Sequence, residues 1–267
     1  MDKQLSITAV VTAGWSPKES DPLVEYTQGG SKAAIPIAGK PMITHVIDAL
    51  AESLYIKHIT IVALDPNLKI PFSVQVEHLP DHGGLISNAN AGIQYALKHH
   101  PNIDAVLLCS SDVPTITPAI VDAFIEECLS TDHDVYYSIV ERSVMEARFP
   151  ESHRSFVHLR DGDFAGGDLF IIRPSTNFDH QDLMKKLSTA RKSALRQASM
   201  LGPIIFFRLL TRRLSLAEAE RRAQKIFEVR ARAVPCPYAE VGMDVDKPFQ
   251  LEIVRAELEA GTAGPAS

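Results

Sequence analysis

The chain has 267 residues, 33 of them acidic and 27 basic, with a formal net charge of -6. A chain of this length can bury a substantial core, and its ordinary share of apolar residues argues against intrinsic disorder. No apolar run approaches the roughly 20 residues that span a bilayer, and the acidic start MDKQ argues against a signal peptide, so we expect a cytoplasmic protein. Three distant cysteines, odd in number, argue against a disulfide framework or a cysteine-based zinc site, and we expect buried thiols at Cys109, Cys128 and Cys236.

The first half of the chain alternates apolar, β-branched runs with segments of helical period. This pattern predicts a parallel sheet with crossover helices. We expect strands at 7–12, 59–64, 74–78, 105–109 and 135–140, and helices at 42–54, 87–99 and 118–129. The last helix has a clear start signal, because the Thr117 hydroxyl can cap free N–H groups and Pro118 fits the first helical turn.

The second half adds a strand at 168–174, after the turn-rich stretch DGDFAGG, and then becomes basic and helical. Between Lys185 and Arg232 there are 13 basic and three acidic side chains. Ser215 and Glu218 form a capping box that predicts a helix over LAEAERRAQKIF. A strand near 232–235 and a helix at 248–259 follow. We therefore expect an α/β domain over 1–178 and 231–260, a basic helical insertion over 179–230, and a flexible tail over 261–267.

In an open α/β sheet, ligands bind beyond the carboxyl ends of the strands, so the loops after the strands are the candidate sites. The loop after the first strand contains TAGW and QGGSK. Glycines there allow backbone N–H groups to approach phosphates, and Lys32 supplies a positive charge. The loop is not a Walker A motif, because Pro41 follows Lys40 where a magnesium-binding Ser or Thr is required. By itself the segment fits a phosphate site and a solvated turn equally well.

A second candidate loop, HLPDHGGLISNANAG, follows the third strand. Gly83 precedes a helix whose first turn holds Ser87 and Asn88. Small residues there would allow a planar base to lie against the backbone. A simple capped helix start is the alternative interpretation.

Three aspartates mark two further loops. Asp112 ends the apolar strand of LLCSSDVPTIT. Burial of a carboxylate there costs free energy unless it is paired or bound to a cation. Its oxygens are suitable ligands for Mg2+ that holds a polyphosphate. Asp112 could instead cap the turn before Pro114. Asp244 and Asp246 flank a valine, so in extended chain their carboxylates could share one face. Asp246 could also cap the helix that follows.

Taken together, these motifs resemble the nucleotidyltransferase superfamily with the glycosyltransferase-A-like fold. That group includes molybdenum-cofactor nucleotidyltransferases, cytidylyltransferases of isoprenoid synthesis and sugar-1-phosphate nucleotidyltransferases. The match runs in order from VVTAGW through SKAAIPIAGKPMITHVIDAL, GGLISNANAGIQYAL and LLCSSDVPTIT to VGMDVDKPFQLEIVRAEL. It implies a three-layer α/β/α Rossmann-like fold with a mostly parallel sheet and a C-terminal helical insertion. It also implies Mg2+-dependent transfer of a nucleoside monophosphate from a nucleoside triphosphate to a phosphorylated small-molecule acceptor, with release of pyrophosphate.

The resemblance further implies roles for individual residues. Lys32 takes the place of the family's phosphate-binding lysine, Asp112 holds Mg2+, and Asp244 or Asp246 is the second carboxylate ligand. The implied catalytic set is Lys32, Asp112 and Asp246, and the implied nucleotide contacts are Ala13, Gly14, Lys32, Gly83, Ser87 and Asn88. Arg154 and Asp168 would bind the acceptor. Asp168 stands where the family has an asparagine, so its carboxylate could also serve as an additional metal ligand.

Other functions remain open at this point. A glycosyltransferase of the same fold would use a nucleotide-sugar and a DxD metal site, which DVD at 244–246 mimics, although its late position argues against this. A catalytically silent nucleotide-binding protein is a third interpretation. We expect no nucleic-acid partner.

The segment 203–214 combines aromatic residues with arginines, as an interfacial helix on anionic lipid does. In the alternative interpretation, this segment packs on the core or on the second subunit of a homodimer.

Overall fold

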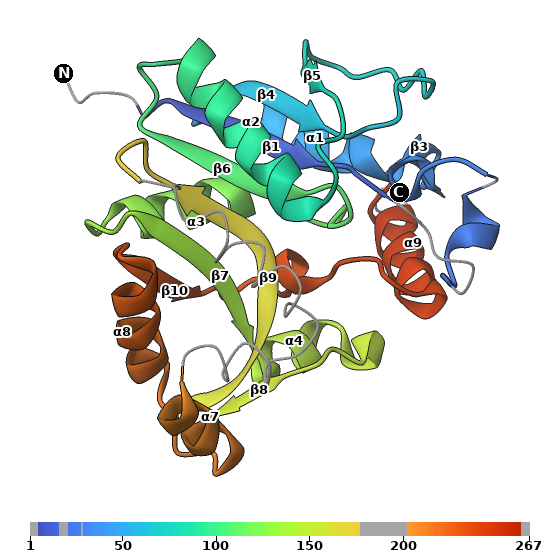
Figure 1. Ribbon diagram of the computed structural model, residues 1–267. Coiled ribbons are helices and arrows are strands. Elements are labelled where there is room, and N and C mark those ends of the chain that lie inside the picture. The colour runs from blue at the N-terminus through green and yellow to red at the C-terminus, as the bar shows by residue number, and fades with distance from the viewer. Residues whose placement is uncertain (1–4, 16–20, 28, 177–201, 263–267) are drawn as a thin grey trace.

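The computed structural model describes residues 5–15, 21–27, 29–176 and 202–262 (Figure 1). Within these residues lies an eight-stranded sheet with the order β10-β7-β9-β6-β1-β4-β5, in which β8 pairs with β9 alone. The strands are β1 (Ile7–Thr12), β4 (Ile56–Val62), β5 (Glu77–Leu79), β6 (Ala105–Ser110), β7 (Val135–Glu141), β8 (Val157–Leu159), β9 (Gly162–Ile172) and β10 (Ala231–Pro235).

Most neighbouring strands of the sheet are parallel. β1 runs parallel to β4 and β6, β4 to β5, and β7 to β10, whereas β9 is antiparallel to both β6 and β7. All six residues of β1 are buried, which fits its sequence of apolar residues and two threonines, because strands of parallel sheets are covered on both faces. The prediction of a mostly parallel α/β sheet is confirmed.

Helices lie on both faces of the sheet. The described helices are α1 (Met42–Ala51), α2 (Leu85–His99), α3 (Pro118–Leu129), α4 (Arg142–Arg148), α7 (Pro203–Leu210), α8 (Leu216–Phe227) and α9 (Pro248–Thr262). On one face, the near side in Figure 1, α2 packs through Ile93 on Val10 and Val62, and Gly92 permits this approach, because a Cβ there would lie 2.3 Å from Val10. Helices α1 and α3 pack together on the opposite face, in the larger apolar core. The sheet and helices thus form the expected three layers.

The interpretation of DGDFAGG as a turn holds only for its first residue, Asp161, because the other six residues form the first half of β9. Two of its glycines are required by close approach of β7. A Cβ at Gly166 would lie 2.0 Å from the Tyr137 hydroxyl, and a Cβ at Gly167 would lie 2.4 Å from Ser138 Oγ. The glycines therefore make room within a strand. No sequence pattern predicted α4, β8 or the hairpin of β2 (Pro36–Ile37) and β3 (Lys40–Pro41).

Helices α7 and α8 form the part of the predicted insertion that the structure describes. The capping box is confirmed: Glu218 N donates to Ser215 Oγ at 3.3 Å, and Ser215 N donates to the Glu218 carboxylate at 3.0 Å. Residues 179–201 of the predicted insertion lie outside the described ranges, as does most of the tail predicted at 261–267, whose first two residues end α9. The domain boundaries therefore stay predictions.

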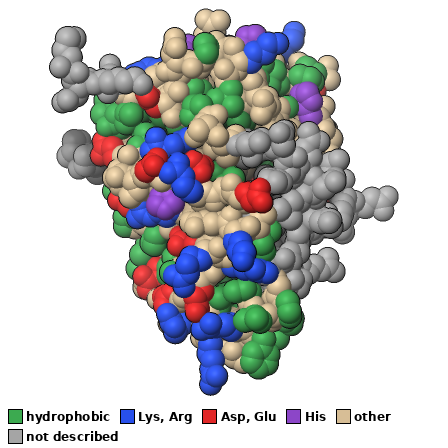
Figure 2. Space-filling view, turned by 60° about the vertical axis from the view of Figure 1, so that its left-hand side comes forward, with side chains coloured by type: hydrophobic (Ala, Val, Ile, Leu, Met, Phe, Trp, Pro, Cys, Tyr) green, Lys and Arg blue, Asp and Glu red, His purple; other side chains and the backbone are tan. Residues whose placement is uncertain are grey.

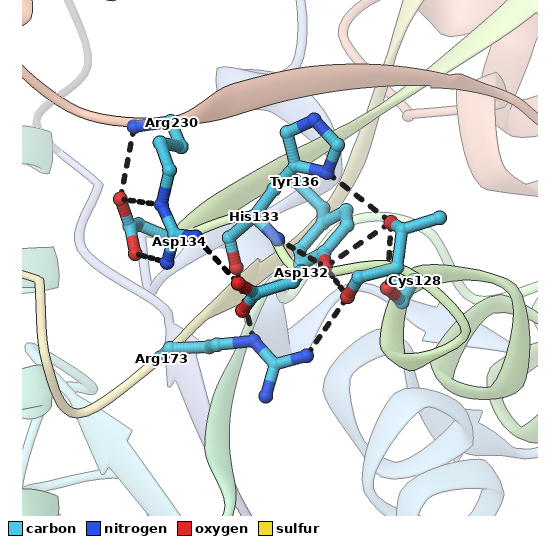
Figure 3. Close-up of polar contacts among 8 residues, drawn as sticks. Cys128, Asp132, His133, Asp134, Tyr136, Arg173 and Arg230 are labelled. Atoms are coloured by element: carbon cyan, nitrogen blue, oxygen red, sulfur yellow. Dashed lines mark hydrogen bonds and ion pairs between the residues drawn. The ribbon is translucent and has the colours of Figure 1, made fainter.

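One loop between α3 and β7 holds both the residue after β9, Arg173, and the residue before β10, Arg230 (Figure 3). Arg173 donates to the carbonyl oxygens of Thr131 and His133, each at 2.9 Å. Arg230 forms ion pairs with Asp132 at 2.6 Å and with Asp134 at 2.7 Å. This network anchors the end of β9 and the start of β10 at adjacent points.

Two further expectations concern the whole chain. The thiols of Cys109, Cys128 and Cys236 are free and buried, as predicted. In the part of the chain that the structure describes, no helix is both long enough and apolar enough to cross a bilayer.

Candidate active site

Lys32 lies between two carboxylates that come from distant parts of the chain. Its Nζ is 2.6 Å from Asp112 Oδ2 and 2.8 Å from Asp246 Oδ1. Burial of the ammonium alone would lower the pKa of Lys32, but the charges of Asp112 and Asp246 outweigh this cost and raise the pKa above its usual value. The three side chains of the implied catalytic set therefore meet at one point.

A short 3-10 helix, Lys32–Ala34, holds the lysine in place. Ser31 caps this turn, with its Oγ accepting from the Ala33 amide at 3.3 Å. Ala33 and Ile35 are almost fully buried and anchor the turn in the core. The turn that carries Lys32 is therefore anchored in the core.

Asp112 and Asp246 are brought together by backbone hydrogen bonds. Asp112 follows β6, and the adjacent Ser111 N donates to the carbonyl of Thr12 at 3.1 Å, which ties this loop to β1. The amide of Val245 donates to the carbonyl of Asp112 at 2.9 Å. The Ser110 hydroxyl also donates to the Asp112 carboxylate. These bonds place the segment that carries Asp246 at the carboxyl end of β6.

Asp168 lies on β9 next to this cluster. Its removal from water, together with the negative charge of Asp112, raises its pKa to about 7, although Arg154 and Lys32 partly offset the shift. Leu169 pairs with Cys109, so Asp168 stands beside the end of β6. The resemblance implied that Asp168 binds the acceptor or serves as an additional metal ligand, and in the structure it is near enough to Asp112 for the two charges to interact.

A bulge in β9 sets the position of Asp168. Tyr137 pairs with Phe170 and Ile139 pairs with Gly166, so three residues of β9, numbers 167–169, stand opposite Ser138 alone. Ser138 fills the gap: its Oγ donates to the Leu169 carbonyl at 2.9 Å and accepts from the Leu169 amide at 3.1 Å. Bulges of this kind redirect side chains beside active sites. Nothing in the sequence marked Ser138, because its role depends on the pairing of two strands.

Asp244 and Asp246 have different partners, although they are only two residues apart. Asp246 reaches Lys32, whereas Asp244 forms an ion pair with Arg154, and the side chains of this second pair are 14% and 16% exposed. The structure therefore does not bring Asp244 to the ammonium that Asp112 and Asp246 share. Arg154 lies close enough to Asp168 to lower its pKa.

Two of the residues predicted to contact the nucleotide, Gly14 and Asn88, lie against each other. A Cβ at Gly14 would lie 2.9 Å from Asn88 Nδ2, so the first loop touches the start of α2. Asn88 is 2% exposed, and its amide is occupied: Oδ1 accepts from His82 N at 2.7 Å and Nδ2 donates to Asp81 at 2.9 Å. Asn88 thus shapes the loop that contains Gly83, a residue with φ of 84°.

A cavity of about 260 Å³ lies beside Ser31, the residue before Lys32. It is lined by Trp15, Val24, Thr27, Gly29, Gly30, Ser31, Ala63 and Asp65. Ser31 connects it to the lysine, and Ala63 connects it to Gly14, since a Cβ at Gly14 would lie 3.1 Å from the Ala63 methyl. The sequence pointed to the glycines of this loop, but Thr27 and Asp65 carried no recognisable signal.

Among the described residues, no three His, Cys, Asp or Glu side chains are placed to hold a metal ion together. The pair Asp112 and Asp246 nevertheless converges on one cation, the ammonium of Lys32. Protein sites for Mg2+ with nucleotides use one or two carboxylates and complete the coordination with phosphate oxygens and water. Two converging carboxylates beside a cavity therefore fit Mg2+ bound together with a triphosphate.

Residues 27–234 match the family model described as MobA-like NTP transferase domain. A structure titled as a hypothetical transferase from Thermus thermophilus is 34% identical, with 92% of this chain and 100% of that chain covered and a TM-score of 0.77. No curated protein sequence matches significantly.

Two more distant structures share the fold. One is CMP:2-keto-3-deoxy-manno-octonic acid synthetase in complex with CTP, with 16% identity, coverage of 97% of this chain and 99% of the other, and a TM-score of 0.55. The other is 2-C-methyl-D-erythritol 4-phosphate cytidylyltransferase from Thermus thermophilus, with 11% identity, coverage of 95% and 98%, and a TM-score of 0.51. At these identities the likeness establishes the architecture alone.

Proposed function

Because the chain belongs to the family of MobA-like NTP transferase domains, we propose that it transfers a nucleoside monophosphate from a nucleoside triphosphate to a phosphorylated small-molecule acceptor. The observation that supports this most strongly is the position of Lys32 between Asp112 and Asp246. A buried cation between two carboxylates at the carboxyl end of a parallel strand lies where α/β sheets bind charged ligands. The residue before it, Ser31, lines a cavity of about 260 Å³.

In the proposed reaction, a phosphate oxygen of the acceptor attacks the α-phosphorus of the triphosphate. The bond from the α-phosphorus to the oxygen that bridges it to the β-phosphorus breaks, and pyrophosphate leaves with that oxygen. Such a reaction needs positioning and neutralisation of charge, and it needs no protein nucleophile. When bound by Asp112 and Asp246, Mg2+ would supply charge neutralisation at the phosphates.

The ammonium of Lys32 has two roles in this account. Without ligands it holds the two carboxylates in place and offsets their repulsion. Once those carboxylates have another cation, its charge is free to face the leaving pyrophosphate. Its position beside Ser31, on the wall of the cavity, supports this role.

The nucleotide and the acceptor approach from opposite sides of Lys32. We assign the nucleotide to the cavity, with Ala13, Gly14, Gly83, Ser87 and Asn88 forming or supporting the adjoining backbone. We assign the acceptor to the side of β9, where Arg154 offers a guanidinium fork suited to a phosphate and Asp168 faces the metal position. The separate partners of Asp244 and Asp246 weigh against a glycosyltransferase DxD pair.

The test is pyrophosphate release with each of ATP, CTP, GTP and UTP, in the presence of Mg2+ and a panel of sugar, polyol and cofactor phosphates. We expect one nucleotide and one acceptor class to give turnover that Asp112→Asn abolishes. Glu52→Gln is the matched control, because it removes an exposed carboxylate outside the site. Tight nucleotide binding without turnover across the panel would favour a catalytically silent binding protein.

A further inference from the structure

Helix α7 is apolar on two sides, but only one side is packed. Leu209 forms a small core with Leu214, together with the partly buried Ile205, Phe206, Val157, Leu159 and Ala219. This core attaches α7 to β8 and α8. The remaining large apolar side chains of the helix take no part in this attachment.

Those remaining side chains are exposed to solvent. Ile204 is 73% exposed, Phe207 is 64% exposed and Leu210 is 53% exposed. A spacing of three residues places them along one side of the helix, and we call them the exposed α7 face. Figure 2 shows hydrophobic side chains gathered at the lower end of the molecule, where α7 lies in Figure 1, with Lys and Arg side chains beside them.

Arginines surround the exposed α7 face. Five arginines but only two glutamates lie between Gly202 and Arg222. Arg212 and Arg213 are exposed and follow the helix directly. At the other end, the Arg222 guanidinium lies beside Gly202, since a Cβ there would be 3.2 Å from it. One of the two acids, Glu218, already pairs with Arg208 at 2.9 Å.

We propose that the exposed α7 face docks on an anionic lipid surface. Its three apolar side chains enter the boundary between headgroups and acyl chains, and the arginines contact lipid phosphates. The remainder of a chain with net charge -6 is repelled by the same surface, so this end of the molecule is turned toward the lipid.

A second copy of the chain is a poorer occupant of this face. In a two-fold dimer the same patch meets itself, so Arg212 and Arg213 of one copy would lie near the same arginines of the other. Like charges at such an interface oppose association. The charge of the patch thus favours an anionic partner over itself.

The test is flotation of the full-length protein with vesicles of phosphatidylcholine alone and of an equal mixture with phosphatidylglycerol. We expect flotation with the mixed vesicles only, and a loss of this binding at high salt. Phe207→Ser should reduce the bound fraction several-fold. Leu54→Ser is the matched control, because Leu54 is also 64% exposed but lies after α1, and it should leave binding unchanged.

Circular dichroism of the variants establishes that they are folded. Absence of flotation, equal flotation with both kinds of vesicle, or equal losses in Phe207→Ser and Leu54→Ser would overturn the proposal. A dimer seen by analytical ultracentrifugation, and lost in Phe207→Ser, would assign the face to a second copy instead.

Discussion

The hydroxyl of Ser138 forms hydrogen bonds with both the carbonyl and the amide of Leu169, at 2.9 Å and 3.1 Å. One buried side chain thus supplies the backbone bonds that β7 cannot make where β9 bulges. The residue held at this bulge is Asp168, so a serine outside the site determines where a site carboxylate lies.

We expect Ser138→Ala to lower the free energy of unfolding by about 1–3 kcal/mol, because it leaves two buried backbone groups unpaired. It should also raise the KM for the acceptor, because Asp168 is no longer held. Urea unfolding and steady-state kinetics measure the two effects. Thr8→Val is the matched control: Thr8 is equally buried, but its hydroxyl has no hydrogen-bond partner, so its loss should be neutral or stabilising. Equal destabilisation by both variants would contradict the role given to Ser138.

A second prediction concerns the pH dependence of stability through Asp168. Its pKa of about 7 lies above the value near 3.8 expected in the unfolded chain. A raised pKa means that the folded state favours the protonated carboxyl, so this group weakens folding progressively as the pH rises from about 4 to about 7.

Asp168→Asn removes that cost. In the absence of divalent metal, we expect the variant to be more stable than the parent by about 1–3 kcal/mol above pH 7, with little difference near pH 4. Urea unfolding at several pH values in EDTA gives the comparison. A gain of the same size at every pH would show that the carboxylate is not the cause.

A third prediction concerns the lysine bridge. Lys32→Met leaves the carboxylate of Asp112, which is 16% exposed, without its ammonium partner, and we expect a loss of about 1–3 kcal/mol of stability in EDTA. Asp246 is 63% exposed, so loss of its own pairing with Lys32 contributes little to this change. Mg2+ should restore stability to this variant more than to the parent, because the metal no longer competes with an ammonium. Thermal unfolding with and without Mg2+ measures both effects.

Lys40→Met is the control for this experiment. Lys40 also pairs with an aspartate, Asp48 at 2.9 Å, but its side chain is 55% exposed, and exposed pairs of this kind contribute little. We expect a change below about 1 kcal/mol and no added response to Mg2+. If the two lysine variants behave alike, the bridge has no special role.

Much of the fold could be predicted from local sequence. β1 and α3 match their predicted bounds, because a run of apolar and β-branched residues marks a buried strand and Thr117 with Pro118 marks a helix start. The first half of β9 could not be predicted in this way. Gly166 and Gly167 resemble turn residues in the sequence, and only the side chains of β7 show why glycine is needed there.

The candidate site likewise has a part that could be predicted from local sequence and a part that could not. Lys32, Asp112 and Asp246 lie in short motifs of charged residues and glycines outside the long helices and strands, so the sequence could single them out. Their contacts could not be predicted, because 80 and 214 residues separate Lys32 from its two partners. The pairing of Arg154 with Asp244 likewise depends on tertiary structure, as does the position of Asp65 on the cavity wall.

Asp112 and Asp246 are central to the proposed function, because together they would hold a divalent cation with a nucleoside triphosphate. Electron paramagnetic resonance of Mn2+, as a substitute for Mg2+, tests this role without knowledge of the acceptor. With a non-hydrolysable triphosphate we expect the parent and Glu52→Gln to bind Mn2+, and Asp112→Asn and Asp246→Asn to bind it at least about tenfold more weakly. Binding by both aspartate variants with the affinity of the parent would contradict the account.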